Sequence, residues 1–243
     1  MKKASLPVQA YKNPEFLLST EARTVRILSE YYEPLARLSR QKVNSTILFF
    51  GSSRANPKDK SSPLHRYYWE AEDLAYRLAR WAIRLKPKGK NFVICTGGGP
   101  GIMEAANRGA SRAGGISIGM NISIPLEQRP NPYITPDLSF LFHYFFMRKF
   151  WLIYRAKAIV AFPGGFGTLD EVFEVLTLIQ TQKMPKTKLH ILLYGEEYWR
   201  NVVHFEKLIE FGTIDPGDLD LFSFASRPKK AFDSLRCKLI ECL

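Results

Sequence analysis

Short hydrophobic runs alternate with helical patterns along most of the chain. Each run is almost continuously apolar, and the segment after it has apolar residues at helical spacing. The strand-like runs cover residues 46–50, 91–95, 116–121, 158–162, 189–194 and 221–225, and the helical patterns cover 67–85, 102–113, 169–180 and 197–211, with a last helix opened by Pro228. This alternation predicts an α/β fold, a Rossmann-like doubly wound parallel sheet with helices on both faces.

The first 43 residues have a different pattern. Ser19 or Thr20 can cap a helix there, and apolar residues recur at helical spacing at Val25, Leu28, Tyr32, Leu35 and Leu38. We therefore predict an N-terminal helical extension over residues 1–43, which packs against the core or a second subunit. Residues 44–243 then form the Rossmann-like domain.

The longest apolar region, residues 138–154, contains eight aromatic side chains. His143, Arg148 and Lys149 interrupt it, and a membrane span of about 20 residues does not easily tolerate such charges. We expect no membrane span. The region predicts a helix buried against the sheet or against a neighbouring subunit.

Composition narrows the class of protein further. The chain has 243 residues and is 46% hydrophobic, so one α/β core needs no disulfide or metal. Cys95, Cys237 and Cys242 lack metal-ligand spacing, Cys95 is expected to be a buried strand residue, and no signal peptide is evident, which indicates the cytoplasm. The net charge of +12 lies in short scattered groups, which favours an ordinary solvated surface over a nucleic-acid track.

Three glycine turns follow predicted strands, at residues 51–54, 97–101 and 164–168. Carboxyl ends of parallel strands meet at one edge, so we expect these turns in one cleft, bordered by the proline-spaced loop 125–136. Glycines let backbone N–H groups approach a phosphate at a helix N-terminus. Neither G-x-G-x-x-G spacing at the first strand nor a P-loop occurs, which favours a mononucleotide or sugar phosphate over NAD or ATP.

Several polar residues near these turns allow two interpretations. Thr168 and Glu171 match a capping box, but Glu171 is also a candidate carboxylate, held ionised by the helix dipole and a nearby arginine. Arg148 and Lys149 either reach solvent from a helix edge or bind a ligand in the cleft, and Arg155 shares that ambiguity. Glu104 and Arg54 are further candidates for ligand contact, and the four histidines show no metal spacing.

Residues 163–171, PGGFGTLDE, resemble the P-G-G-x-G-T-x-x-E signature of the Lonely Guy family, the cytokinin riboside 5'-monophosphate phosphoribohydrolases often labelled lysine decarboxylases. Arg148-Lys149 matches the family's R-K pair, and residues 97–103 look like its other glycine turn, within a resemblance that covers residues 44–215. The resemblance implies that Arg148 and Glu171 are catalytic and that the assembly is a homodimer or larger. The residues expected to bind substrate are Gly51, Ser52, Arg54, Gly98, Gly99, Gly101, Glu104, Lys149, Gly164, Gly165, Gly167 and Thr168.

The chain departs from the plant pattern M-H-x-R-K, because Phe145-Phe146-Met147 precedes Arg148. It resembles the longer bacterial branch of the family, so AMP or a related purine monophosphate is the expected substrate. The predicted reaction is hydrolysis of the N-glycosidic bond to free base and ribose 5-phosphate, without metal or organic cofactor. The alternatives are a carrier or sensor that binds the nucleotide and leaves it intact, a nucleic-acid binder, and a pyridoxal-phosphate decarboxylase.

Overall fold

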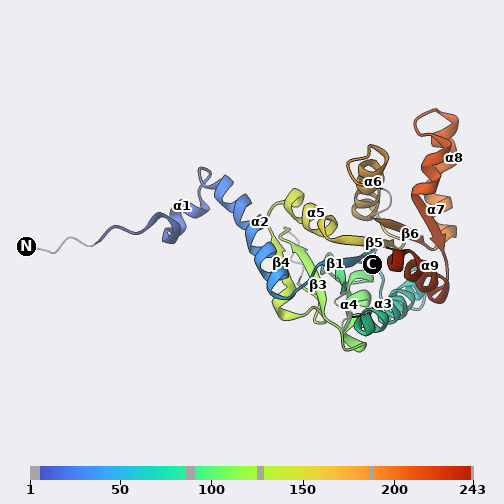
Figure 1. Ribbon diagram of the computed structural model, residues 1–243, viewed down its shortest axis with the longest axis horizontal. Helices are drawn as coiled ribbons and strands as arrows, with labels where there is room; N and C mark the ends of the chain where they lie inside the picture. Colours follow the sequence, from blue (N-terminus) through green and yellow to red (C-terminus); the bar gives the residue numbers. More distant parts are fainter. Residues whose placement is uncertain (1–5, 86–90, 125–128, 186–188, 242–243) are drawn as a thin grey trace, which may run out of the picture.

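A seven-stranded parallel sheet forms the centre of the molecule (Figure 1). The computed structural model describes residues 6–85, 91–124, 129–185 and 189–241. The strands are β1 (Ser45–Phe50), β2 (Phe92–Thr96), β3 (Ser117–Ile122), β4 (Ser139–Phe142), β5 (Ala156–Ala161), β6 (His190–Tyr194) and β7 (Phe222–Ala225). Their order is β4-β3-β2-β1-β5-β6-β7, so the direction of winding reverses between β1 and β5.

Helices cover both faces of the sheet. One face is packed by α3 (His65–Leu85), α4 (Ile102–Arg112) and α9 (Pro228–Glu241). The other is packed by α2 (Arg23–Arg40), α5 (Phe145–Tyr154), α6 (Phe166–Gln180), α7 (Glu196–Val202) and α8 (Phe205–Glu210). The short segments η1 (Ala10–Lys12), α1 (Pro14–Leu18), η3 (Pro136–Leu138) and η5 (Pro216–Leu221) complete the described elements.

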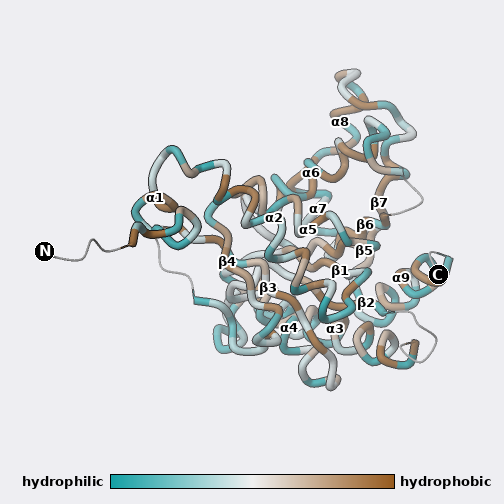
Figure 2. Tube along the Cα trace, turned by 60° about the vertical axis from the view of Figure 1, so that its left-hand side comes forward, coloured by the Kyte–Doolittle hydropathy of each residue, from teal (hydrophilic) through white to brown (hydrophobic). Residues whose placement is uncertain are grey.

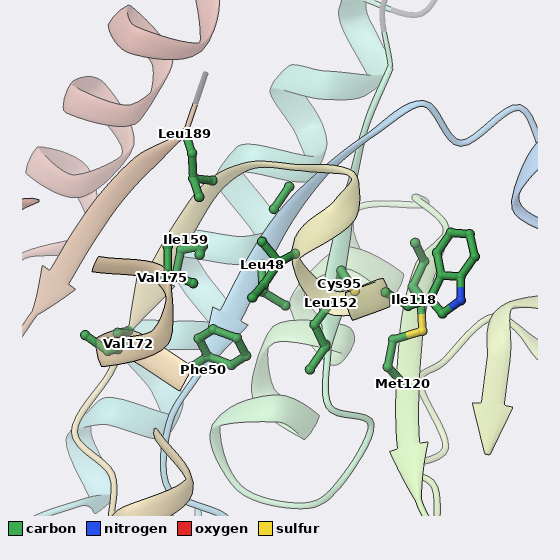
Figure 3. Packing of buried hydrophobic residues seen from close by; sticks show 14 of the residues in the cluster. Leu48, Phe50, Cys95, Ile118, Met120, Leu152, Ile159, Val172, Val175 and Leu189 are labelled. Atoms are coloured by element: carbon green, nitrogen blue, oxygen red, sulfur yellow. The ribbon is translucent and has the colours of Figure 1, made fainter. Parts of the chain in front are cut away.

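The side chains of β1 show why the strands are almost continuously apolar. Ile47 and Phe49 belong to the core under α3 and α4, whereas Leu48 and Phe50 belong to the core on the opposite face. Figure 3 shows Leu48 and Phe50 beside Val175 and other residues of this second core. Because successive side chains alternate between two buried faces, both sets must be hydrophobic. The predicted fold class is confirmed.

Two predicted helices are divided in the structure. Residues 138–154 do not form one helix, since η3 and β4 precede α5. In β4, Phe140 and Phe142 are buried and Leu141 is 67% exposed, which is the period-two pattern of a strand. Residues 197–211 divide into α7 and α8 because Val203, the C-cap of α7, adopts an extended conformation. Val202 and Val203 are both β-branched, and β-branched residues favour extended backbone over helix.

The N-terminal helices lie to one side of the sheet, and α1 lies farther from it than α2 (Figures 1 and 2). The predicted caps are wrong: α2 starts after Ala22 without a side-chain cap, and Asn13 caps α1 instead. Leu38 is buried and Leu35 packs on the core, but the other predicted apolar residues, Val25, Leu28 and Tyr32, are exposed. The boundary between extension and domain stays a prediction.

Contacts from Glu30 connect α2 to α5. The Glu30 carboxylate accepts hydrogen bonds from the backbone N–H groups of His143 at 2.7 Å and Tyr144 at 3.2 Å, just before α5 begins. The Trp151 indole Nε1 donates to the Glu30 backbone carbonyl at 2.9 Å. The N-terminal segment therefore fixes the start and the middle of the helix that carries Arg148.

Two further predictions concern single features. None of the described helices is both long and hydrophobic enough for a membrane span. Cys95 is fully buried in β2, as predicted, and Cys237 is exposed. Cys242 and part of the proline-spaced loop, residues 125–128, lie outside the described residues.

Backbone contacts of Ser52 hold the three glycine turns together. Its N–H donates to the Pro163 carbonyl at 2.9 Å, and its carbonyl accepts from the Ile102 N–H at 3.1 Å. Gly101 has φ +72°, and a Cβ there would clash with the Ser52 carbonyl. The turns after β1, β2 and β5 are thus in direct contact at the point where the winding reverses.

Replacing Gly101 with alanine tests this backbone junction. The positive φ alone costs about 1–2 kcal/mol for an alanine, and the clash with Ser52 adds to it. We expect Gly101→Ala to lower the free energy of unfolding by at least about 2 kcal/mol, measured by urea denaturation. Gly212→Ala is the matched control, because Gly212 has φ +68° and no atom near its Cβ position. Equal losses in the two variants would contradict the close contact at Gly101.

Candidate active site

A cavity of about 800 Å³ opens where the winding of the sheet reverses. The turns after β1 and β5 line the cavity, and Gly97 is the residue of the turn after β2 that lines it. Ligands of doubly wound sheets bind at this topological position. Of the predicted site residues, Gly51, Ser52, Arg54, Arg148, Gly164, Gly165, Gly167, Thr168 and Glu171 all line the cavity.

The N-terminus of α6 points its unpaired amides at this region. Gly165 is the N-cap, and no side chain caps the helix. The first helical hydrogen bond runs from the Leu169 N–H to the Gly165 carbonyl, so the amides of residues 166–168 have no intrahelical acceptor. Thr168 is the third residue of α6, and therefore the capping-box interpretation of Thr168 and Glu171 is wrong. The free amides and the helix dipole favour an anion.

Gly165 and Gly167 have open space where a Cβ would lie. Both glycines are exposed and line the cavity, and neither has a positive φ. Among the described residues, neither packing nor backbone conformation requires glycine at these two positions. A ligand that approaches the main chain closely would require it. Gly164 is different, because a Cβ there would meet the Thr168 side chain and lie 3.0 Å from the Ser52 nitrogen.

Arg148 of α5 and Glu171 of α6 form an ion pair inside the cavity. Arg148 Nη1 lies 3.6 Å from Glu171 Oε1, and each side chain is 13% exposed. Arg148 Nε donates to the Met120 carbonyl at 2.8 Å, which holds the guanidinium against β3. Of the two interpretations of Arg148, the structure therefore favours the cleft arginine. Arg155 instead donates to the Val43 carbonyl, away from the cavity.

Burial dominates the electrostatics of this pair. It raises the pKa of Glu171 to about 7, although Arg148 and Lys149 act in the opposite direction. Burial also lowers the pKa of Arg148, partly offset by Glu171, yet a guanidinium stays charged near neutral pH. The expectation that dipole and arginine hold Glu171 fully ionised is therefore wrong. Desolvation outweighs an arginine that is too far away to form a hydrogen bond.

Lys149 contacts α6 and does not line the cavity. Its Nζ lies 2.6 Å from Asp170 Oδ2 and 3.0 Å from Glu174 Oε2. These ion pairs connect α5 and α6 beside the Arg148–Glu171 pair. The structure gives Lys149 this linking contact in place of the predicted substrate contact.

The second glycine turn is mostly buried in protein. The Asn131 side-chain amide donates to the carbonyls of Gly98 and Gly99, and Gly101 packs on Ser52. Glu104 accepts a hydrogen bond from the Tyr68 hydroxyl at 2.8 Å. These four predicted substrate-binding residues do not line the cavity. Their contacts shape the turn and leave Gly97 at the cavity wall.

Other cavity residues were not among the individual site residues that the sequence predicted. They are mainly apolar or aromatic and come from several elements: Phe50, Leu64, Met103, Ile122, Ile124, Phe145, Phe166, Tyr198 and Val202. Tyr198 follows β6, so the rule that ligands bind at the carboxyl ends of strands could have found it. The described part of the chain has no group of three His, Cys, Asp or Glu residues suited to a metal ion.

The fold and the site define a class of protein. Where the winding of the doubly wound sheet reverses, a glycine turn leads into the uncapped helix α6, and a buried arginine–glutamate pair lies beside it. A sequence profile of the family described as "possible lysine decarboxylase" matches residues 103–235, more than half of the chain. The chain belongs to this family, the Lonely Guy family that the glycine motif indicated.

Two relatives have names that state an activity. A pyrimidine/purine nucleotide 5'-monophosphate nucleosidase of Escherichia coli K12 is 30% identical over 131 residues, which are 49% of this chain. A probable cytokinin riboside 5'-monophosphate phosphoribohydrolase of rice, LOGL2, is 32% identical over 89 residues, 36% of this chain. The matches span only 27% of the length of the E. coli protein and 36% of that of the rice protein.

Solved structures show the same fold at lower identity. The molybdenum cofactor binding protein of Rippkaea orientalis superposes with a TM-score of 0.51 at 20% identity, and covers 81% of this chain and 98% of its own. Similarity at this level establishes the architecture alone.

The raised pKa of Glu171 predicts a pH-dependent stability. Between the ordinary value of 4.5 and about 7, the folded protein binds more protons than the unfolded chain, so this contribution to stability falls as pH rises through that range. Glu171→Gln lacks the titration. We expect the free energy of unfolding of this variant, relative to wild type, to increase by about 1–3 kcal/mol from pH 5 to pH 8.

Urea denaturation at both pH values measures this difference. Glu197→Gln is the control, since the Glu197 side chain is 80% exposed, and its difference from wild type should stay constant within error. A constant difference for Glu171→Gln as well would refute the raised pKa.

Lys149→Met tests whether the ion pairs of Lys149 between α5 and α6 contribute more to stability than an exposed ion pair does. It leaves Asp170 and Glu174 as like charges one helical turn apart, and we expect a loss of about 1–2 kcal/mol in unfolding free energy. Lys207→Met removes an exposed ion pair with Glu210 and should change the free energy of unfolding by less than about 1 kcal/mol. Thermal and urea denaturation measure both, and equal effects would count against the link.

Proposed function

We propose that this protein hydrolyses the N-glycosidic bond of a nucleoside 5'-monophosphate to free base and ribose 5-phosphate. One observation carries the proposal: the uncapped N-terminus of α6 and the Arg148–Glu171 pair line the same cavity. The two relatives named for this class of reaction support it.

The phosphate binds at the start of α6. The main-chain amides after Gly165 donate to its oxygens, and the helix dipole adds to the attraction. Gly165 and Gly167 leave the space that this approach needs. Arg54, an exposed residue on the rim of the cavity, adds positive charge. A phosphate held at this point positions the ribose over the interior of the cavity.

Glu171 acts on the ribose side of the bond. With a pKa near 7, the ionised carboxylate takes a proton from the attacking water, whose oxygen bonds to the anomeric carbon as the carbon–nitrogen bond breaks. The departing base takes one proton from solvent water, and Glu171 releases the proton it accepted to solvent at the end of the cycle, so protons balance over the reaction. The negative carboxylate also stabilises the positive charge that develops on the sugar ring. Arg148 orients the sugar phosphate, and its ion pair with Glu171 keeps the carboxylate in position.

The walls of the cavity bind the base. Phe145, Met103, Ile122 and Val202 give an apolar surface that suits a planar heterocycle. The departure from the plant pattern at Phe145-Phe146-Met147 lies in the same region, so AMP or a related purine monophosphate is the proposed substrate.

A homodimer or larger assembly in the cytoplasm belongs to the same proposal. Phe145, Phe146 and Phe150 on α5 and Tyr32 on α2 are large side chains that are 37–61% exposed. Exposed apolar surface of this extent suits a subunit contact close to the cavity.

Product analysis tests the proposed reaction. Incubation with AMP should release adenine and ribose 5-phosphate, resolved by chromatography. Glu171→Gln and Arg148→Met should each lower kcat by roughly 10²–10⁴-fold, because proton transfer and charge in the transition state are lost. A panel of nucleoside monophosphates in the same assay ranks the bases.

Glu210→Gln and Arg236→Met serve as matched controls and should keep wild-type turnover, since both residues lie outside the cavity. AMP that binds and stays intact would favour a carrier and contradict hydrolysis. Full activity in Glu171→Gln would reject the assigned chemistry.

A further inference from the structure

Tyr198 supports the glycine turn from the wall of the cavity. Its hydroxyl donates a hydrogen bond to the Gly164 carbonyl at 2.5 Å. Tyr198 and Val202 lie one helical turn apart on α7, and both line the cavity. The neighbouring Trp199 is fully buried, and its indole Nε1 donates to the carbonyls of Ala161 and Tyr194 at 3.1 Å each. The position of α7 is therefore fixed to the ends of β5 and β6.

A bond to the Gly164 carbonyl also fixes the next amide. The Gly164 carbonyl and the Gly165 N–H belong to one planar peptide unit, and the described residues contain no cis peptide bond. In a trans peptide the two groups point in opposite directions. The Tyr198 hydroxyl therefore holds the Gly165 N–H on the side facing away from α7, and the same contact fixes the start of α6.

Glycine cannot supply this rigidity by itself. Gly165 and Gly167 have open space around them and more conformational freedom than other residues. Gly164 lies in close packing, because a Cβ there would overlap the Thr168 side chain and lie 3.0 Å from the Ser52 nitrogen. We propose that Tyr198 is a positioning residue, which orders the Gly164–Gly165 peptide so that the amides of this turn are directed at the substrate phosphate. This proposal rests on the proposed function, because it takes the phosphate to bind at the turn.

Tyr198→Phe tests the proposal, since it removes one hydroxyl and keeps the ring. Calorimetry should show Kd values for AMP and for ribose 5-phosphate raised about three- to tenfold, as expected for one lost hydrogen bond. The Kd for adenosine, which has no phosphate, should stay within about twofold. In turnover assays KM for AMP should rise by the same factor while kcat changes less.

Tyr154→Phe is the matched control. Tyr154 lies on α5, is 54% exposed and does not line the cavity, and it should keep all Kd values. Unchanged AMP binding in Tyr198→Phe would overturn the proposal, and so would equal weakening of AMP and adenosine binding. If wild type binds AMP without hydrolysing it, the proposed function fails, yet the ratio of AMP to adenosine affinity still decides the role of Tyr198.

Discussion

The main chain of Ser52 is the contact on which the site depends. It bonds to the turn after β5 through its N–H and to the start of α4 through its carbonyl. These bonds bring together segments from three separate βα units at the point where the winding reverses. Gly51, Gly101 and Gly164 each abut this junction so closely that a Cβ would overlap a neighbour. Backbone packing at this junction therefore shapes one wall of the cavity, independently of the side chains of Arg148 and Glu171.

Two opposite charges share this cavity in an electrostatic compromise. Burial lowers the pKa of Arg148 and raises the pKa of Glu171, which in both cases favours the neutral form. The attraction between the two charges only partly offsets these shifts. The Met120 carbonyl holds Arg148 in place, and Lys149 binds the two carboxylates that flank Glu171 on α6. An exposed glutamate would be almost fully ionised at neutral pH. Desolvation gives this one a pKa suited to proton exchange, which is typical of functional carboxylates.

Local patterns in the sequence predicted the sheet, the helices beside it and the cavity turns, because each depends on periodicity or on glycine. They did not predict β4, because the strand is only four residues long. Its alternation of buried Phe140 and Phe142 with exposed Leu141 lies within a long aromatic run that reads as one helix. The ionisation of Glu171 depends on burial by distant elements, and the sequence motif alone carries no measure of it. Likewise, Gly98 and Gly99 bind Asn131, which lies more than 30 residues away.

The helix that carries Arg148 depends on the N-terminal segment. No side chain from its own N-cap caps α5, whose first turn contains no acidic residue. The Glu30 carboxylate from α2 bonds to the amides just before α5 and places a negative charge at the positive end of its dipole. Since Glu30 also receives the Trp151 hydrogen bond, α2 holds α5 at two points one on each side of Arg148. The segment around α2 is thus part of the framework that positions α5 and Arg148, although none of its described residues, 6–43, lines the cavity.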